Sequence, residues 1–166
     1  MAAADIGDLY RKHGADVFRF VLYLSGNRAD AEDITSETFV RAWTSPSPIR
    51  MATVKGYLFT IARRLFLQGR RGASRHVALS EELREPGPGP QVRAERNSEL
   101  DAALASLQKL SEIDRSALLM RAHDELSYEE IARALGLSLA SVKVRIHRAR
   151  LALVRIREAS RHEGNA

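Results

Sequence analysis

Residues 127–150 read SYEEIARALGLSLASVKVRIHRAR, and this stretch predicts two short helices joined by a tight turn. Ser127 followed three residues later by Glu130 forms a capping box, which marks the start of the first helix. Gly136 tolerates the left-handed backbone conformation in which helices commonly end. Ser138 is a residue type that caps helix N-termini, so the second helix is expected to start there. The stretch therefore predicts a helix-turn-helix.

The second helix of this motif has two unlike faces. Its apolar residues recur at helical spacing and form a stripe suited to a core, namely Leu139, Val142, Ile146, Ala149 and Leu153. The opposite arc carries small, basic and hydrogen-bonding side chains, namely Ala140, Lys143, Val144, His147 and Arg148. A helix with such a face fits the major groove of duplex DNA, where base edges offer hydrogen-bonding groups.

The alternative is an ordinary helical hairpin with a solvated basic face. From Leu139 to Arg161 the chain carries seven Lys and Arg residues and one acid, an excess larger than the net charge of +5 of the whole protein. A helix that is merely solvated normally mixes charges of both signs. This concentration of positive charge favours DNA binding.

The composition is that of a folded globular protein. The chain has 166 residues, of which 45% are hydrophobic and 28% charged, enough for one domain or two small ones. Without cysteine there are no disulfides and no thiolate metal sites. The N-terminal residues lack the basic start of a signal peptide and no apolar run approaches membrane-spanning length, so we expect a cytoplasmic protein without membrane insertion. A sequence pI near 10.0 favours a polyanionic partner.

The prolines divide the chain. All five lie in two segments, TSPSP at 44–48 and EPGPGP at 85–90, and the rest lacks the alternation of β-branched residues that marks strands. The predicted fold class is therefore all-α. The polar, Pro/Gly-rich segment 80–97 reads as a linker between two small helical domains, residues 1–79 and 98–166. Helices are expected at about 6–24, 30–43, 54–76, 100–110 and 111–123.

The helix expected at 30–43, DAEDITSETFVRAW, carries a ridge of acids. Asp30, Asp33 and Glu37 fall within about 60° of one another on a helical wheel, opposite the apolar half that holds Phe39 and Trp43. Acids near a helix N-terminus are favourable in themselves, which accounts for Asp30 and Asp33 but not for Glu37, two turns in. Two interpretations stay open, a partner-docking face and a stabilised helix start.

The next expected helix, 54–76, is basic. No acid occurs from Lys55 to His76, and Tyr57, Phe59 and Phe66 are interleaved with the bases. Positive charge beside aromatic rings suits a strand of unpaired bases, since charge binds phosphates and rings stack on bases. A core helix with a solvated arginine edge explains the same pattern equally well.

Taken together, these segments resemble the extracytoplasmic-function sigma factors, which are compact bacterial transcription initiation factors. DAEDITSETFVRAW is similar to the family's polymerase-binding helix, GYLFTIARRL to the helix that engages the promoter −10 element, and LSYEEIARALGLSLASVKVRIHRAR to the helix-turn-helix that reads the −35 element. Repressors share the last segment only, so the three in this order are specific. The resemblance covers nearly the whole chain.

The resemblance implies a sigma factor that binds core RNA polymerase and directs it to particular promoters. The resemblance implies that the β′ clamp helices are bound by Asp30, Asp33, Glu37 and Arg41. It implies that the opened −10 strand is bound by the loop 44–53 and by Lys55, Tyr57, Arg63, Arg64, Arg70 and Arg71. It implies that the −35 element is contacted by Ser141, Lys143, Val144, His147, Arg148 and Arg150. The partners implied are core polymerase with its β′ and β subunits, promoter DNA, and an anti-sigma factor.

The alternatives are a stand-alone helix-turn-helix regulator and an enzyme. A stand-alone helix-turn-helix repressor or activator needs neither the acidic ridge nor the basic helix before the linker. An enzyme is disfavoured, because there is no GxxxxGK loop to cradle phosphates and the five histidines lack metal-ligand or triad spacing. We therefore expect no catalytic residue, no metal and no cofactor.

Overall fold

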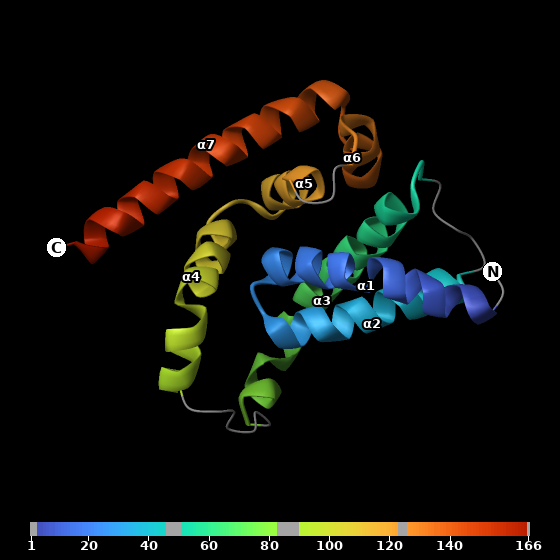
Figure 1. Ribbon diagram of the computed structural model, residues 1–166, viewed down its shortest axis with the longest axis horizontal. Coiled ribbons are helices and arrows are strands. Elements are labelled where there is room, and N and C mark those ends of the chain that lie inside the picture. Colours follow the sequence, from blue (N-terminus) through green and yellow to red (C-terminus); the bar gives the residue numbers. More distant parts are fainter. Residues whose placement is uncertain (1–2, 46–50, 83–89, 123–125, 166) are drawn as a thin grey trace.

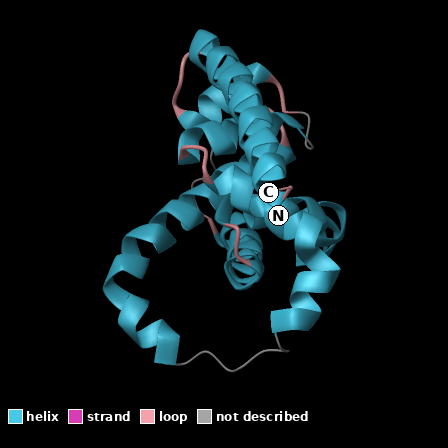
Figure 2. Cartoon of the chain, turned by 90° about the vertical axis from the view of Figure 1, so that its left-hand side faces the viewer, coloured by secondary structure: helices cyan, strands magenta, loops and turns pink. Residues whose placement is uncertain are grey.

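The computed structural model describes residues 3–45, 51–82, 90–122 and 126–165, with side chains described outside 3–5, 71–82 and 90–97. These residues form seven α-helices, and no strand occurs among them (Figures 1 and 2). The all-α prediction is confirmed. No helix within the described ranges is long and apolar enough to cross a membrane.

The first three helices, α1 (Ala3–Ser25), α2 (Arg28–Thr44) and α3 (Val54–Glu82), pack into an N-terminal bundle. The ring of Phe20 on α1 stacks on that of Phe59 on α3, with 4.6 Å between their centroids. Phe39 of α2 meets Tyr10 of α1 edge to face at 5.1 Å. Aromatic pairs in these geometries add stabilisation beyond their buried area. The bundle therefore holds α2 and α3 side by side on α1.

The acidic helix starts earlier than expected. The Asn27 side chain accepts a hydrogen bond from the Asp30 N–H at 3.0 Å and caps α2, which begins at Arg28 rather than Asp30. Asparagine is among the best N-capping residues because its short side chain reaches the free N–H groups of the first turn. The Trp43 ring, which the sequence placed on the apolar half of this helix, is 47% exposed in the last turn of α2.

The remaining helices are α4 (Pro90–Gln108), α5 (Glu112–Ala122), α6 (Tyr128–Leu135) and α7 (Leu139–Gly164). The helix-turn-helix is confirmed in α6 and α7. Ser127 accepts a hydrogen bond from the Glu130 N–H at 3.1 Å, and Gly136 ends α6 with a φ of 66°. Ser138 accepts from the Ser141 N–H, also at 3.1 Å, and starts α7.

The predicted apolar stripe of α7 is largely buried. Val142, Ile146 and Ala149 are at most 1% exposed, whereas Leu153 is only partly buried. Leu139, at the first position of α7, is 37% exposed and does not join the core. The buried stripe packs α7 onto α5 and α6, which fixes the direction of its opposite, exposed face.

The two helical units meet. Helix α3 continues to Glu82 and α4 begins at Pro90, so helices occupy both ends of the segment 80–97 that we expected to be a linker, and residues 83–89 lie outside the described ones. Proline is tolerated in a first helical turn because its missing N–H would have no partner there. Helix α5 packs on α1 and α6 on α3 (Figure 1), and a single hydrophobic core runs through both units.

A buried arginine fastens the junction between the units. Arg115 of α5 is 3% exposed and donates from Nε to the Leu24 carbonyl and from an Nη to the Leu110 carbonyl, both at 2.9 Å. Gln108 donates to the Tyr23 carbonyl at 3.1 Å. The bonds to Tyr23 and Leu24 satisfy carbonyls at the end of α1, which have no partner within their own helix.

Candidate functional site

The residues predicted to face the −35 element lie together on α7. Lys143, Val144, His147, Arg148 and Arg150 are exposed, and Ser141 is half-buried. Because Val142 and Ile146 bury the opposite side of the helix, these side chains share the outward face. The structure thus brings together all six predicted residues on one helix, and five of them are exposed.

Two interactions set the edge of this face. Lys143 and Arg121 both lie over the ring of Tyr128, with the Lys143 nitrogen 5.7 Å and the Arg121 guanidinium carbon 4.3 Å from its centroid. A cation within about 6 Å of a ring face is attracted to it. Arg145 turns the other way, because one of its Nη atoms donates to Asp114 of α5 at 2.9 Å. Arg145 therefore anchors α7 to α5, whereas the basic residues predicted to face the −35 element stay exposed.

The predicted polymerase-binding residues Asp30, Asp33, Glu37 and Arg41 are all exposed on α2. Glu37 pairs with Arg41 at 3.1 Å, and an ion pair this exposed contributes little to stability. Sequence reasoning missed one apolar member of this surface, Val40, which is 50% exposed. The helical spacing already predicts this position, because Val40 follows Asp33 by seven residues and so lies on the same side of the helix.

A groove of about 500 Å³ separates α2 from α3. It joins residues predicted for two different partners, since Glu37 and Arg41 line one wall while Tyr57 and Arg64 line the other. Val40, Thr44, Ser45, Ile61, Leu65 and Gln68 complete its lining. The groove ends next to the loop that follows Thr44, most of which lies outside the described residues.

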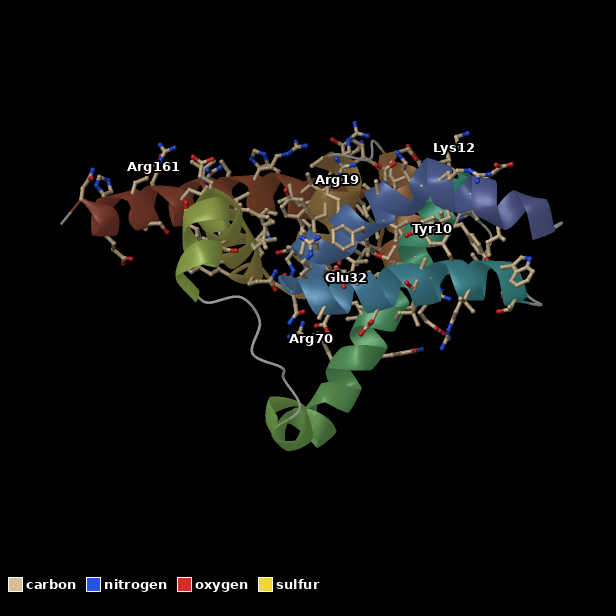
Figure 3. All side chains as sticks on the ribbon, turned by 60° about the horizontal axis from the view of Figure 1, so that its bottom comes forward. Tyr10, Lys12, Arg19, Glu32, Arg70 and Arg161 are labelled. Atoms are coloured by element: carbon tan, nitrogen blue, oxygen red, sulfur yellow. The ribbon has the colours of Figure 1, made fainter. Side chains whose placement is uncertain are left out.

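The other residues predicted for the −10 strand are dispersed. Lys55 pairs with Asp16 of α1 at 3.3 Å, and Arg70 is exposed over the Phe66 ring at 5.6 Å. The Arg71 side chain lies outside the described ones. Figure 3 shows Arg70 on α3 and Arg161 near the end of α7 in separate parts of the molecule, so basic side chains are presented at two places.

The aromatic half of the −10 prediction needs correction. Phe59 is fully buried and Phe66 is 7% exposed, so neither ring is available to stack on a base. Both belong to the hydrophobic core, which uses one side of α3 for packing. Tyr57, half-buried at the groove, is the one member of the three whose ring is partly accessible.

Arg63, predicted to bind the −10 strand, forms a bidentate ion pair with Glu112 of α5. Its Nε and one Nη donate to the two carboxylate oxygens at 2.7 and 3.1 Å, and the two side chains are only 14% and 16% exposed. The Ser116 hydroxyl donates to the same carboxylate at 2.7 Å. Burial alone would raise the pKa of Glu112, but the hydrogen bonds from Arg63 and Ser116 outweigh it and the pKa lies below 4.5.

A second carboxylate crosses the junction. Glu130 of α6, 6% exposed, accepts hydrogen bonds from the Thr53 N–H at 2.8 Å and from the Thr53 hydroxyl at 2.6 Å. That hydroxyl in turn accepts from the Gly56 N–H at 3.0 Å and caps α3. The sequence placed Glu130 in a local capping box, and its carboxylate instead binds the capping residue of a helix in the other unit.

Within the described residues no group of His, Asp and Glu side chains has the arrangement of a metal site. What the geometry offers is surface chemistry, a basic face on α7 and an acidic and apolar face on α2. The described part of the chain is thus an all-α helix-turn-helix protein with two exposed helix faces of opposite charge.

Similarity to known proteins identifies the family of this chain. The family models "Sigma-70 region 2" and "Sigma-70, region 4" match residues 9–76 and 100–153. The chain is 41% identical over 148 residues to the ECF RNA polymerase sigma factor SigE of Mycolicibacterium smegmatis, covering 86% of this chain and 58% of SigE. It is 33% identical over 155 residues to the ECF RNA polymerase sigma factor SigL of Mycobacterium tuberculosis, covering 91% of this chain and 88% of SigL.

A solved structure agrees over both units. The sigma factor RpoE of Bartonella quintana, in complex with the anti-sigma factor NepR, superposes with a TM-score of 0.73 at 25% identity, over 93% of this chain and 97% of that one. The chain belongs to the extracytoplasmic-function family of RNA polymerase sigma factors.

Proposed function

We propose that this sigma factor docks on core RNA polymerase through α2 and reads the promoter −35 element through α7. The observation that carries the proposal is the exposed surface of α2, where Asp33 and Glu37 share one side of the helix with the exposed Val40. Apolar anchors surrounded by charge are typical of protein–protein interfaces. A stand-alone repressor needs the helix-turn-helix but has no use for this second surface.

The −10 strand is proposed to follow the groove between α2 and α3. Tyr57 offers a ring for stacking and Arg64 a charge for phosphates, both at the wall of the groove. Lys55, Arg63, Arg70 and Arg71 would add to the basic environment along α3. The groove adjoins the polymerase-facing residues, so a strand held there would lie beside the polymerase.

The partners follow from this role. Core polymerase and promoter DNA are the obligatory ones, and an anti-sigma factor is proposed as the regulator because the RpoE relative was solved with NepR. The chain itself is proposed to act in the cytoplasm without catalysis, as a specificity subunit. Its division into functional units at 1–79 and 98–166 gives each unit one promoter element.

Strand opening with and without polymerase tests the proposal. Melting a promoter costs about 1.4 kcal/mol for each stacked step, and the described surface offers few exposed rings to meet that cost. The template is a pool with randomised −35 and −10 sequences upstream of a constant transcribed region. Permanganate reactivity of unpaired thymines and sequenced run-off transcripts are measured for the protein, the polymerase and the mixture.

We expect defined transcript starts and reactive thymines only when the protein and the polymerase are mixed, and not with either component by itself. Enriched templates should share a −35 sequence and a −10 sequence at fixed spacing. Tight duplex binding by the protein, with no transcript when polymerase is added, would identify a repressor and overturn the proposal.

A further inference from the structure

The C-terminal part of α7 extends past the hydrophobic core and faces α4 (Figure 1). A groove of about 320 Å³ lies between these two helices. The charged residues that line it are all basic, namely Lys109 of α4 and Arg157 and Arg161 of α7. No ion pair joins any of the three to another residue that the structure describes. Three positive charges thus meet in one groove without a carboxylate among its lining residues.

The two arginines lie on the inner side of α7, away from the face proposed for the −35 element. Arg157 and Arg161 follow Ala149 and Leu153 at intervals of four residues, and side chains at this spacing share one side of a helix. The row is apolar where α7 packs on α5 and α6, and it is basic where α7 faces α4. Duplex DNA on the outward face of α7 would therefore lie on the other side of the helix from this groove.

An anion in the groove would relieve a repulsion between these charges. Like charges four residues apart destabilise a helix, as Arg157 and Arg161 do here. Lys109 adds a third charge from the opposite wall. A cleft lined by charges of one sign concentrates the electrostatic potential and attracts counterions. The groove is therefore suited to an anion that carries several charges.

The other lining residues restrict the chemistry of such an anion. Ala102 and Ala105 have short side chains, which leave the α4 wall of the groove open. The hydroxyls of Ser106 and Ser160 donate to the Ala102 and Ile156 carbonyls at 2.9 and 3.0 Å, so the cations are the donors left for a ligand. A guanidinium binds phosphate through two parallel N–H bonds, and a lysine ammonium acts as a point charge. The volume is at the small end of the range of about 300–1,000 Å³ for ligand pockets, which suits linked phosphates.

We propose that the groove between α4 and α7 binds an oligophosphate, an anion with two or more linked phosphate groups. Arg157 and Arg161 supply paired N–H donors from α7, and Lys109 supplies a charge from α4. The ligand is an inorganic oligophosphate or the phosphate chain of a nucleotide, because both present the same groups to the three cations. A bound oligophosphate holds the C-terminal part of α7 against α4. The site is independent of the proposed docking surface on α2 and of the −35 face.

Calorimetric titration of the full chain tests the site. The probes are inorganic tripolyphosphate, ATP without magnesium, and orthophosphate, at physiological ionic strength, where exposed charges are screened beyond about 8 Å. We expect one tripolyphosphate per chain, and orthophosphate should bind at least about tenfold more weakly because it engages fewer of the cations. Equal affinities for ATP and tripolyphosphate would assign recognition to the phosphates alone, and tighter binding of ATP would assign the site to a nucleotide. Either ratio supports the proposal.

Four variants locate the site. Arg157→Gln/Arg161→Gln should weaken tripolyphosphate binding at least about tenfold, since two charge-assisted interactions are lost. Lys109→Gln should also weaken it, which a site on α7 alone would not show. Ala105→Glu places a carboxylate in the groove with every cation kept, and it should abolish binding. The matched control is Arg155→Gln, which removes the same charge from nearly the opposite side of α7 and should keep the wild-type affinity.

Thermal melting provides a second measurement. A ligand that binds only the folded chain raises its melting temperature, so tripolyphosphate should stabilise wild type and the control but not the double arginine variant. Circular dichroism checks that each variant keeps its helices. An equal loss of affinity in Arg155→Gln and in the double variant would show unspecific attraction to basic helices and overturn the site. Tighter binding of an alternating Asp-Glu octapeptide than of tripolyphosphate would assign the groove to an acidic protein segment and overturn the oligophosphate.

Discussion

Arg148 is the residue whose replacement most directly probes promoter reading. It is exposed on the outward face of α7, opposite the buried Val142 and Ile146, and it forms no ion pair with another described residue. Replacement by alanine therefore removes no contact that holds the fold together. Any loss of affinity is assigned to the contact with DNA.

The size of the loss depends on what Arg148 touches. A bidentate arginine contact to a guanine edge contributes about 1–3 kcal/mol of discrimination, which corresponds to about 5- to 150-fold in Kd. A phosphate contact instead weakens binding to all sequences alike and lowers the salt dependence by about one released counterion. We expect the first behaviour for Arg148→Ala and the second for Arg155→Ala, further along the same exposed helix.

Fluorescence titrations on two duplexes measure the difference. One duplex carries the −35 sequence selected by the wild-type protein from a randomised pool, and the other carries the same bases in scrambled order. Arg148→Ala should reduce the affinity ratio between the two, and Arg155→Ala should leave the ratio unchanged. An equal loss on both duplexes for Arg148→Ala would refute the base-reading role.

Three further predictions concern docking and stability. Reversal of Asp33 and Glu37 to lysine replaces attraction by repulsion at the proposed polymerase interface, so co-purification with core polymerase should collapse while circular dichroism stays the same; undiminished co-purification would contradict the docking role of α2. Arg115→Met leaves the buried Leu24 carbonyl without its charged donor, and chemical denaturation should show a loss of about 2–4 kcal/mol, whereas an unchanged midpoint would show that the bond contributes nothing. Burial, and then the charges of nearby lysines, lower the pKa of His13 below 6.5, so the unfolded chain binds more protons and stability falls as the pH drops below about 6.5; melting temperatures between pH 7.5 and 5.5 should fall less in His13→Asn than in wild type, and equal slopes would contradict this.

The sequence alone determined the features that depend on neighbours a few residues apart. The caps at Ser127 and Ser138, the left-handed Gly136 and the apolar stripe of Val142 and Ile146 all follow from helical spacing, and all occur in the structure. The exposed arcs of α2 and α7 follow from the same rule, because the buried side of a helix fixes the side that is left. The fold class and the exposed face of α7 were therefore predictable without any knowledge of packing.

Only the tertiary structure decided how residues far apart in the chain share partners. The Ser127 and Glu130 pattern predicted a reciprocal local cap, but the Glu130 carboxylate bonds Thr53, 77 residues away. Spacing along one helix cannot show that another helix end offers a free N–H at the right distance. In the same way, the basic and aromatic pattern of α3 could not show that Arg63 meets Glu112 or that Phe59 stacks in the core. A buried charge takes the partner that packing brings within reach, and that choice is made by the assembled helices.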